Sequence, residues 1–581
     1  MAVVLDSDTN WFEVANPEGT AEDNKTIGTG SIARRYTTTK ACGLNDRIVA
    51  AAGEIVAKHR PVERRALLAS DVAPFAVGPE AAALVFSNAI IDAAGHAWNL
   101  DWRFRLGQDD DVITVAREAT PQHAESLVAF EGPMLYVGAG TFGGAKDSAI
   151  LPGLEWLTAD EESSNTLDIW TDEHVRYVPH PHKVTVPALA IAYDGAAIGL
   201  LWDPLEPWHD DVSRLSPVYA SPHHFEGKNA GLMGLMAPSV PDYVSENARE
   251  ARTPYPVGPG EPIAINAGIA LLAPTDGPLS VVDAWYAQYG TPDPMPYPRG
   301  DILSELEFTM EAFMDSLWIP DEKQWEMYLD GGSHFSAQGR PAQFLMFLEL
   351  AARLVDLPAL ADAYRQRYDE VVDAGAGVAH PQFCYYNQTL GPDAVLPSMT
   401  ANVASLIAQQ WEDGTWRFDA DQPIPVDPTK TGHFLGPDEA SELGLSAANA
   451  LTVAQFARLT GDAYATERTI LTLETLKQFR IPRAAQVWEV PVHTPDVLAA
   501  GYGVQAYLEG YLITGRQDFL DEAVYWARAV LPFIYTWGDP AFDWMRYGSI
   551  PVFGATMYTG CLLYTSPSPR DRTRSRMPSS A

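Results

Sequence analysis

The sequence from Ala457 to Arg468 reads Ala-Arg-Leu-Thr-Gly-Asp-Ala-Tyr-Ala-Thr-Glu-Arg, with a tight turn between two amphipathic segments. Glycine after one helical segment and aspartate before the next are typical of a helix end and a helix start. The same plan recurs at Ala352–Ala363 and at Leu512–Ala523. The recurrence predicts repeated helical hairpins, which build either an open solenoid or a closed ring. Long loops between the hairpins favour the ring.

The second half of the chain has helical spacing of apolar residues throughout. A proline-rich stretch, Pro292–Arg299, precedes it, and there the apolar period changes from two residues to about 3.6. We predict a linker at 291–300 and a helical domain at 301–560. The predicted helices are Ile302–Trp318, Ala342–Val355, Leu360–Ala374, Ser398–Trp411, Asp438–Leu459, Ala465–Arg480, Pro495–Thr514 and Phe519–Tyr535.

The first half of the chain has the pattern of a β-sandwich, which we predict for residues 61–290. Asp194-Gly195 between two apolar runs predicts a hairpin. Residues 1–60 are predicted to be irregular, with one helix at Asp46–His59. The predicted strands, rich in Val, Ile, Tyr and Trp, are Ala81–Asn88, Asp111–Arg117, Met134–Val137, Val184–Tyr193, Ala197–Trp202 and Glu261–Leu271.

Composition restricts the classes of protein to which the chain can belong. With 581 residues, 46% hydrophobic and 20% charged, it is typical of a soluble multi-domain protein. The net charge of −37 opposes nucleic-acid binding, and the longest apolar runs are too short for a membrane helix. Three cysteines exclude a disulfide framework. We expect a cytoplasmic protein, because no secretory signal is visible at Met1; a secreted or periplasmic protein is the alternative if the natural start precedes Met1.

The last residues have a different character. Cys561-Leu-Leu-Tyr-Thr-Ser-Pro-Ser-Pro-Arg-Asp571 is similar to translated sequencing-adapter DNA, so we expect residues 561–581 to be non-native. This tail carries four Arg and one Asp, which leaves −37 − 3 = −40 for the rest of the chain. We therefore expect a helical domain that is truncated near Gly560.

The chain resembles the six-hairpin glycosidase-like proteins, whose catalytic domain is an (α/α)6 toroid. The resemblance rests on the turns Thr460-Gly-Asp462 and Thr514-Gly515, on Gln410-Trp-Glu-Asp-Gly-Thr-Trp416, and on the preceding β-sandwich. It covers about residues 60–560 and implies an incomplete toroid. The order of sandwich before toroid resembles glucoamylases and sugar phosphorylases. The resemblance implies a carbohydrate-active enzyme, with an oligo- or polysaccharide as substrate.

The stretch Gln486-Val-Trp-Glu-Val-Pro-Val-His-Thr-Pro-Asp496 contains the leading catalytic candidate. Thr494 and Pro495 are typical of the first positions of a helix, so Glu489 falls in a loop at a helix start. The resemblance implies that such loops hold proton-transferring groups. The neighbours Trp488 and Val490 provide an apolar setting that raises the pKa of a carboxyl group, as a general acid requires. The alternative is a salt-bridged loop residue.

A glycoside hydrolase needs a second carboxylate as base or nucleophile. The candidates are Asp330, in Tyr328-Leu-Asp-Gly-Gly-Ser-His334, and Asp438 or Glu439, each before or at the start of a helix. Helix capping is the alternative for each. Three histidines occur in the same kind of inter-hairpin loop and are predicted to bind substrate: His334, His433 and His493.

A polysaccharide lyase is the second hypothesis, because it needs a tyrosine or histidine base and a group that neutralises a uronate. His380-Pro-Gln-Phe-Cys-Tyr-Tyr-Asn387 supplies Tyr386 and Asn387, and Arg483 lies near Glu489 in the sequence. Packing aromatics are the alternative for the tyrosines. A sugar-binding scaffold without catalysis is the third hypothesis.

The β-rich half contains a histidine-rich segment, Arg176-Tyr-Val-Pro-His-Pro-His-Lys183. We predict that His180 and His182 bind an anionic sugar, in a loop that completes the toroid's pocket. The spacing of a familiar zinc site is absent from the sequence, so we expect no metal. No phosphate loop or dinucleotide fingerprint is convincing, so we expect no cofactor.

Overall fold

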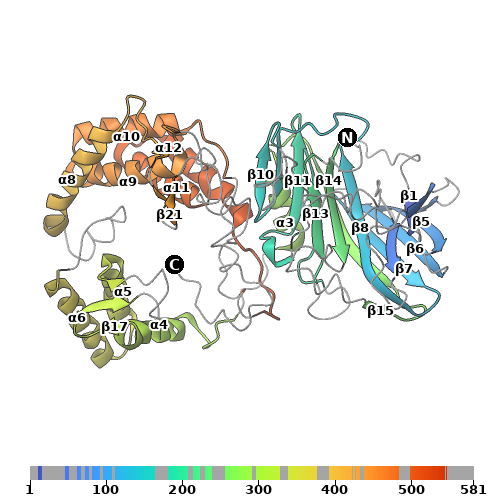
Figure 1. Ribbon diagram of the computed structural model, residues 1–581, viewed down its shortest axis with the longest axis horizontal. Helices are drawn as coiled ribbons and strands as arrows, with labels where there is room; N and C mark the ends of the chain where they lie inside the picture. Colours follow the sequence, from blue (N-terminus) through green and yellow to red (C-terminus); the bar gives the residue numbers. More distant parts are fainter. Residues whose placement is uncertain are drawn as a thin grey trace. The chain divides into compact units, whose positions relative to one another are not determined.

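The computed structural model describes residues 11–15, 46–50, 62–66, 72–76, 81–91, 96–107, 111–161, 163, 179, 181–206, 214–222, 229–237, 255–275, 277–290, 296–326, 338–375, 392–421, 423–424, 427–431, 438–482, 497–542 and 545. The chain divides into two compact units (Figure 1). Unit 1 consists of Met1–Asp293, Ile481–Val497 and Ala529–Ala581. Unit 2 consists of Pro294–Arg480 and Leu498–Arg528. The chain therefore leaves unit 1 and returns to it twice.

The larger sheet of unit 1 is antiparallel throughout its nine strands. Each of its strands pairs with at least one neighbour, and the seven inner strands pair on both sides. In spatial order the strands are β10 (Glu155–Thr158), β9 (Ser148–Leu151), β11 (Ala188–Tyr193), β12 (Ala196–Leu201), β16 (Ile263–Leu272), β7 (Val112–Pro121), β6 (Ala97–Gly107), β5 (Ala81–Ile91) and β4 (Val72–Ala76).

The second sheet of unit 1 has seven strands and is antiparallel except for the pair β1–β2. Its path runs β13 (Ser216–Ala220), β14 (Gly231–Ala237), β8 (Glu125–Val137), β2 (Asp46–Ala50), β1 (Trp11–Ala15) and β3 (Val62–Ala66), and β15 (Tyr255–Val257) pairs with β8. Buried side chains of both sheets form one apolar cluster, which includes Trp98 and Ile265 of the larger sheet and Phe130 and Met233 of the smaller.

The predicted strands are confirmed, since each overlaps an observed strand. The predicted hairpin is also present, because β11 and β12 pair through Tyr193 and Ala196 around Asp194 and Gly195. Both turn residues have positive φ, 49° for Asp194 and 70° for Gly195. This backbone matches the right-handed twist of the paired strands, which is why Asp-Gly marks such turns.

Two elements of the first half differ from the sequence prediction. The helix predicted at Asp46–His59 is wrong at its start, where Asp46–Ala50 forms strand β2 and pairs with β8. Its β-branched pair Ile48-Val49 suits a strand, and pairing with β8 overrides the helical spacing. Helix α3 (Leu279–Tyr289) lies inside the region predicted to be all β. It packs on β12 at Gly199, where a Cβ atom would lie 2.2 Å from Val281 Cγ1.

Each of the eight helical regions predicted from the sequence overlaps an observed helix of unit 2, and the last helix ends at Ala529 rather than at the predicted Tyr535. The first helical region consists of α4 followed by a π-helical turn (Ala312–Ser316). A small three-stranded sheet contains β17 (Trp318–Ile319), β18 (Gln324–Glu326) and β19 (Gln338–Gly339). A two-stranded sheet contains β20 (Pro423–Ile424) and β21 (Asp427–Thr431). The helices are α4 (Ile302–Glu311), α5 (Ala342–Leu354), α6 (Pro358–Asp373), α8 (Pro392–Gln409), α9 (Leu443–Thr460), α10 (Ala463–Leu476), α11 (Val497–Thr514) and α12 (Gln517–Ala529).

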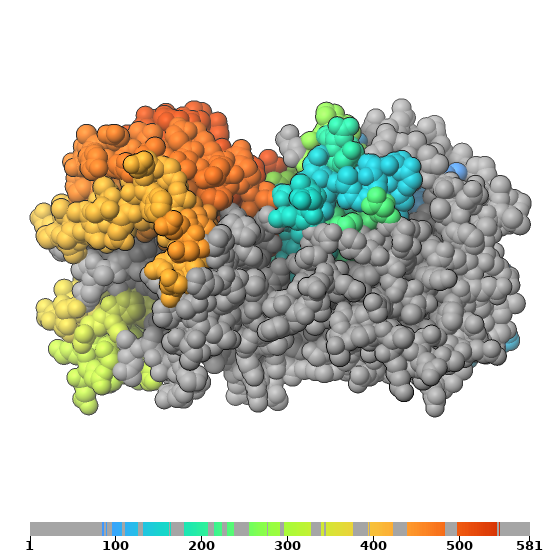
Figure 2. Space-filling model, turned by 45° about the horizontal axis from the view of Figure 1, so that its top comes forward, coloured from blue at the N-terminus to red at the C-terminus, as the bar shows by residue number. Residues whose placement is uncertain are grey.

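The three predicted helical turns join α5 to α6, α9 to α10 and α11 to α12. Gly461 ends α9 with a left-handed backbone, and the Asp462 carboxylate accepts a hydrogen bond from the Ala465 N–H at the start of α10. Helices α9 and α11 bury residues around most of their circumference. Two ion pairs, Lys477–Asp518 and Arg480–Glu522, join the segment after α10 to α12. Figure 2 shows α8 to α12, in yellow and orange, as one continuous surface.

Helices α9 and α11 run parallel and begin at the same end of unit 2. A Cβ atom on Gly444, near the start of α9, would lie 3.0 Å from Ala499 Cβ, near the start of α11. Farther along, Arg458 of α9 and Glu509 of α11 form a bidentate ion pair with N–O distances of 2.6 and 3.1 Å.

Candidate functional site

The end of unit 2 where α9 and α11 begin contains a buried carboxyl group, that of Glu442. Its backbone is extended, and its side chain accepts hydrogen bonds from the N–H groups of Gly444, at 2.6 Å, and Leu445. The side chain caps α9, because those N–H groups have no partner inside the helix. Burial raises the pKa of Glu442 to about 7, against the lowering effect of the two N–H groups. The group therefore titrates near neutral pH.

A second segment, 410–420, packs against the residues that precede α9. Phe418 and the 439–440 pair exchange two backbone hydrogen bonds of 2.8 Å, and the Ala420 N–H donates to Asp438 Oδ1 at 3.0 Å. The Trp416 N–H donates to Ser446 Oγ at 3.1 Å. The structure thus brings together two regions that the sequence singled out separately, the 410–416 element and the acidic pair at 438–439.

Asp438 and Glu439 have different surroundings in this arrangement. Asp438 is engaged by the backbone of Ala420, as expected of a structural carboxylate. Glu439 is exposed, and its backbone has a φ of 60°, in the left-handed region that residues other than glycine seldom adopt. Such backbone strain costs on the order of 1–3 kcal/mol and clusters at functional sites. Glu439 is therefore an exposed carboxylate on a backbone conformation that is seldom adopted.

Glu442 was missed by sequence reasoning, which began the helix at Asp438 and so placed Glu442 inside it. The observed helix begins at Leu443. Glutamate is not among the residues preferred at the N-cap, so the local sequence carries no strong signal for this position. Only burial of the helix start, together with Gly444 close to α11, reveals an unusual carboxyl group.

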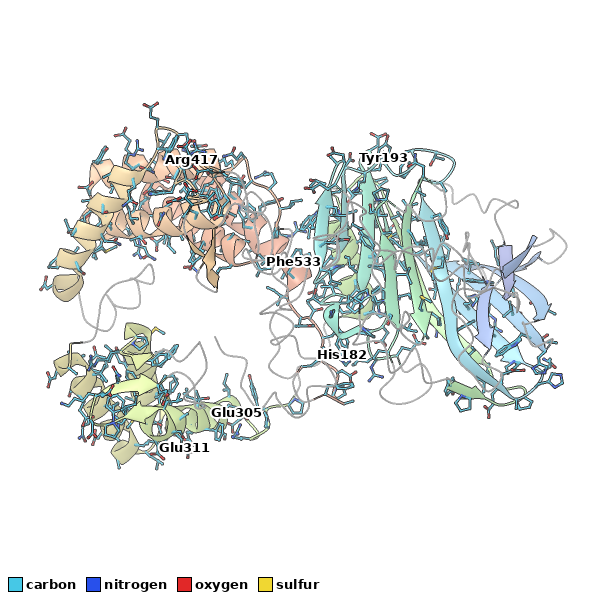
Figure 3. The ribbon with its side chains drawn as sticks, viewed as in Figure 1. His182, Tyr193, Glu305, Glu311, Arg417 and Phe533 are labelled. Atoms are coloured by element: carbon cyan, nitrogen blue, oxygen red, sulfur yellow. The ribbon has the colours of Figure 1, made fainter. Side chains whose placement is uncertain are left out.

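His182 of unit 1 is described, and it is buried (Figure 3). Its Nε2 lies 3.2 Å from Asp539 Oδ2, and Arg214 Nε lies 3.0 Å from the same oxygen. The ring of Phe542 packs edge-on against the imidazole, with 4.4 Å between the ring centroids. The histidine thus joins an internal charge cluster of unit 1 with Asp539 and Arg214, neither of which sequence reasoning had singled out.

Most of the predicted site residues lie outside the described residues. The sequence prediction for each of them stays a prediction. They are Glu489, Asp330, Trp488, His493, His334, His433, Tyr386, Asn387, Arg483 and His180.

Within the described ranges, His, Cys, Asp and Glu side chains form no group of three or more that could hold a metal ion. Among the helices that the structure describes, none combines the length and the apolar character that crossing a membrane requires.

Comparisons with known proteins found distant structural likenesses. No protein-family model matches the chain, and no curated protein matches it in sequence. A polysaccharide lyase is 9% identical, over 85% of this chain and 76% of its own, with a TM-score of 0.29. The α-N-acetylgalactosaminidase NagBb from Bifidobacterium bifidum is 12% identical, over 57% and 52%, with a TM-score of 0.28.

A third solved structure matches a smaller part of this chain. The α-galactosidase AgaA from Geobacillus stearothermophilus is 12% identical, over 42% of this chain and 30% of its own, with a TM-score of 0.23. The chain spans less than a third of that enzyme. All three neighbours are carbohydrate-active enzymes by name.

Proposed function

We propose that the chain is a glycoside hydrolase that cleaves a glycosidic bond by carboxylate acid and base catalysis. Glu439 would act at the end of unit 2 where α9 and α11 begin. The observation that carries the proposal is Glu439, an exposed carboxylate on a strained backbone, three residues from the buried Glu442. Strained positions and carboxyl groups with a raised pKa are both typical of catalytic sites.

The proposed roles follow from what glycosidic cleavage requires. A protonated carboxyl group gives its proton to the leaving oxygen, and a carboxylate activates water or attacks the sugar. We assign proton donation to Glu489 and the second role to Glu439, with Asp330 as its alternative. Glu442 has both carboxyl oxygens engaged by backbone N–H groups, so it is a positioning residue that fixes the start of α9, three residues after Glu439.

We also infer that the helical hairpins belong to an (α/α) ring, preceded by a β-sandwich. Alternating buried and amphipathic helices support this arrangement, as do the parallel starts of α9 and α11. In such a ring the segments that precede the buried helices meet at one end. Of the predicted site residues in unit 2, His433 and Glu439 come shortly before α9 in sequence, and Asp330 and His334 come shortly before α5.

The experiment is an activity screen of the protein against neutral and uronate-containing polysaccharides. New reducing ends and the ultraviolet absorbance of an unsaturated product are measured together. We expect reducing ends without that absorbance, and we expect Glu489→Gln and Glu439→Gln each to lower kcat by at least about a hundredfold. Glu467→Gln, an exposed glutamate of α10, is the matched control and should retain full activity.

Other outcomes would contradict the proposal in distinct ways. Absorbance that rises with the reducing ends on a uronate polymer would establish a lyase and direct attention to Tyr386 and Arg483. Saccharide binding without product would establish a scaffold. If Glu489→Gln and Glu439→Gln both kept the activity of the Glu467→Gln control, the assigned roles would be wrong.

A further inference from the structure

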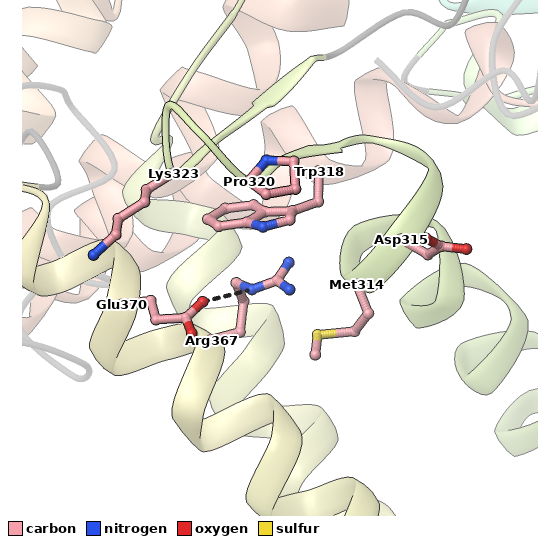
Figure 4. Close-up of a pocket in the computed structure, with 7 residues that line it drawn as sticks. All are labelled: Met314, Asp315, Trp318, Pro320, Lys323, Arg367 and Glu370. Carbon is pink, nitrogen blue, oxygen red and sulfur yellow. Dashed lines mark hydrogen bonds and ion pairs between the residues drawn. The ribbon is translucent and has the colours of Figure 1, made fainter.

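A cavity of about 450 Å³ lies in unit 2, apart from the starts of α9 and α11 (Figure 4). The π-helical turn Ala312–Ser316, the turn between β17 and β18, and helix α6 form its walls. The lining includes Met314, Asp315, Trp318 and Arg367. Its volume falls within the range of about 300–1,000 Å³ that small-molecule sites occupy.

Arg367 is held in a fixed orientation at this cavity. Its guanidinium carbon lies 3.8 Å from the centroid of the Trp318 ring, and its Nε donates to Glu370 Oε2 at 3.2 Å. One terminal nitrogen also donates to the Phe313 carbonyl at 3.4 Å. A guanidinium has five N–H groups, so these contacts orient the group and engage two of them. Figure 4 shows the two terminal nitrogens on the side away from Glu370, toward Met314.

The cavity is lined by both hydrogen-bond donors and hydrogen-bond acceptors. Lys323 and Arg367 are donors, whereas Asp315 and Glu370 are acceptors, and Met314 and Trp318 add apolar surface. Two cations and two anions leave no net charge among these four groups. A ligand that fits them needs both donors and acceptors, together with C–H groups for the apolar surface. Sugar hydroxyls both donate and accept, and a sugar ring has C–H faces.

The wall that holds Asp315 is itself unusual. Residues 312–316 form a π-helical turn, in which the Leu317 N–H donates to the Ala312 carbonyl at 2.9 Å. Such turns are rare and frequently occur at functional sites. The wider turn follows α4 directly and supplies both Met314 and Asp315 to the cavity.

We propose that this cavity is a second saccharide-binding site, which takes one or two sugar units of a neutral carbohydrate. Arg367 donates to sugar hydroxyls, Asp315 accepts from them, and Met314 and Trp318 pack against the ring. The choice of a saccharide rests on the proposed function. The cavity shares no residue with the starts of α9 and α11, so it serves to hold a substrate chain and not to cleave it.

The test uses Met314 as a local reporter. Methionine methyl groups are labelled with carbon-13 in the whole chain, and the Met314 resonance is assigned with Met314→Leu. Glucose, galactose, mannose, xylose and N-acetylgalactosamine are titrated one at a time, with galacturonate and sodium sulfate as anionic probes. We expect at least one neutral sugar to shift the Met314 resonance with a saturating dependence on concentration.

Variants of the lining residues test whether the sugar binds in this cavity or elsewhere on the protein. Arg367→Gln and Asp315→Asn should each weaken the binding reported by Met314 at least tenfold. Asp315 is exposed, so its variant should fold even if Arg367→Gln does not. The matched control is Arg365→Gln, on the same helix, where an exposed arginine pairs with Asp362. It should leave the binding unchanged.

Three results would overturn the inference. A Met314 resonance that responds to none of the neutral sugars shows that the cavity binds no such ligand. A response to galacturonate or sulfate alone shows an anion site. Equal effects of Arg365→Gln and Arg367→Gln show that Arg367 has no special role. If the protein cleaves a polysaccharide but no sugar shifts the Met314 resonance, this inference is wrong and the proposed function stands. If a neutral sugar shifts the Met314 resonance but no polysaccharide is cleaved, the proposed hydrolase is wrong and the binding site stands.

Discussion

Glu442 shows how strongly the surroundings of one side chain change its chemistry. Burial favours the uncharged carboxyl group, while the N–H groups of Gly444 and Leu445 favour the carboxylate, and the resulting pKa is about 7. The sequence presents this residue as one of two glutamates in a short acidic segment. Exposed Glu439, three residues earlier, was predicted as a candidate because it lies near a helix start.

The raised pKa of Glu442 predicts a dependence of stability on pH. The Glu442 carboxyl group binds a proton more tightly in the native state than in the unfolded state. Its contribution to the free energy of unfolding is therefore highest below about pH 4.5 and falls as the pH rises through about 7. With ~1.4 kcal/mol for each pKa unit, the loss is roughly 3 kcal/mol. Glu442→Gln should remove it, because the amide does not titrate and still accepts a hydrogen bond.

Urea unfolding of unit 2, followed between about pH 4.5 and pH 8, measures this effect. Glu467→Gln, which removes an exposed carboxylate from α10, should keep the slope of the native protein. A Glu442→Gln variant with the same slope as Glu467→Gln would show that Glu442 does not titrate in this range.

At the scale of elements, the turns of unit 2 were predictable where local chemistry alone fixes the backbone. Gly461 ends α9 with a φ of 73°, and nothing lies within 4 Å of a Cβ added there. Gly414, in the 410–416 element, has a φ of 85°, and an added Cβ would lie 2.8 Å from Leu471 Cγ and from the Thr472 backbone nitrogen. The two glycines share a conformation and differ in packing.

The two glycines therefore predict substitutions of unequal cost. Gly461→Ala should lower the free energy of unfolding by about 1 kcal/mol, through backbone strain alone. Gly414→Ala should cost at least about 3 kcal/mol, because the α10 backbone must also move. Equal shifts in the urea midpoint of unit 2 would show that the contact at Gly414 is relieved without cost.

Elements whose local pattern was ambiguous were predicted wrongly or missed. Asp46–Ala50 has helical spacing of apolar residues, yet it pairs with β8 as strand β2. Leu279–Tyr289 contains the β-branched pair Val281-Val282, yet it forms α3 against the larger sheet, with the Trp285 indole N–H donating to the Trp202 carbonyl at 2.9 Å. Short apolar runs suit either structure, so tertiary packing determines the outcome.

At the scale of the whole molecule, unit 1 is completed by a segment that follows the helices in sequence. Residues 532–542 lie against residues 182–185. The Thr536 N–H donates to the Thr185 carbonyl at 3.2 Å, and the Trp537 indole N–H donates to the Val184 carbonyl at 2.9 Å. Asp539 is fully buried between His182 and Arg214. The β-rich unit therefore depends on residues more than 300 positions away in the chain.

This cluster predicts sensitivity of unit 1 to acid. Burial raises the pKa of Asp539, but hydrogen bonds from His182 and the Ala541 N–H, with the charge of Arg214, leave the pKa below its usual range. The stability that Asp539 contributes is present above its unfolded pKa of about 3.9 and is lost as the pH falls through the lowered value. Asp539→Asn should remove that dependence.

At neutral pH the same variant should lower the free energy of unfolding by about 3–5 kcal/mol, because Arg214 stays buried without its carboxylate. Amide hydrogen exchange in β11 and β12 measures the loss within unit 1. Asp362→Asn, an exposed ion-pair residue of unit 2, should leave that exchange unchanged. Unchanged exchange in Asp539→Asn would mean that the cluster does not stabilise the sheet.

Local patterns in the sequence were enough for the division into a β-rich half and a helical half, for eight helical regions, and for the turns at Asp194-Gly195 and Gly461. These features depend on backbone preferences and on the period of apolar residues within a few neighbouring positions. The placement of Glu439 near a helix start was predictable for the same reason. The roles of Glu489 and of the other residues outside the described ranges stay predictions.

Tertiary structure alone decided which distant residues meet. The parallel starts of α9 and α11, the burial of Glu442, the cavity beside Arg367, and the pairing of His182 with Asp539 across 357 positions have no local signature. Each depends on contacts between segments that are far apart in the chain. Burial and pairing depend on the neighbours that folding supplies, so they change the charge and exposure of a side chain in ways that its own sequence window does not record.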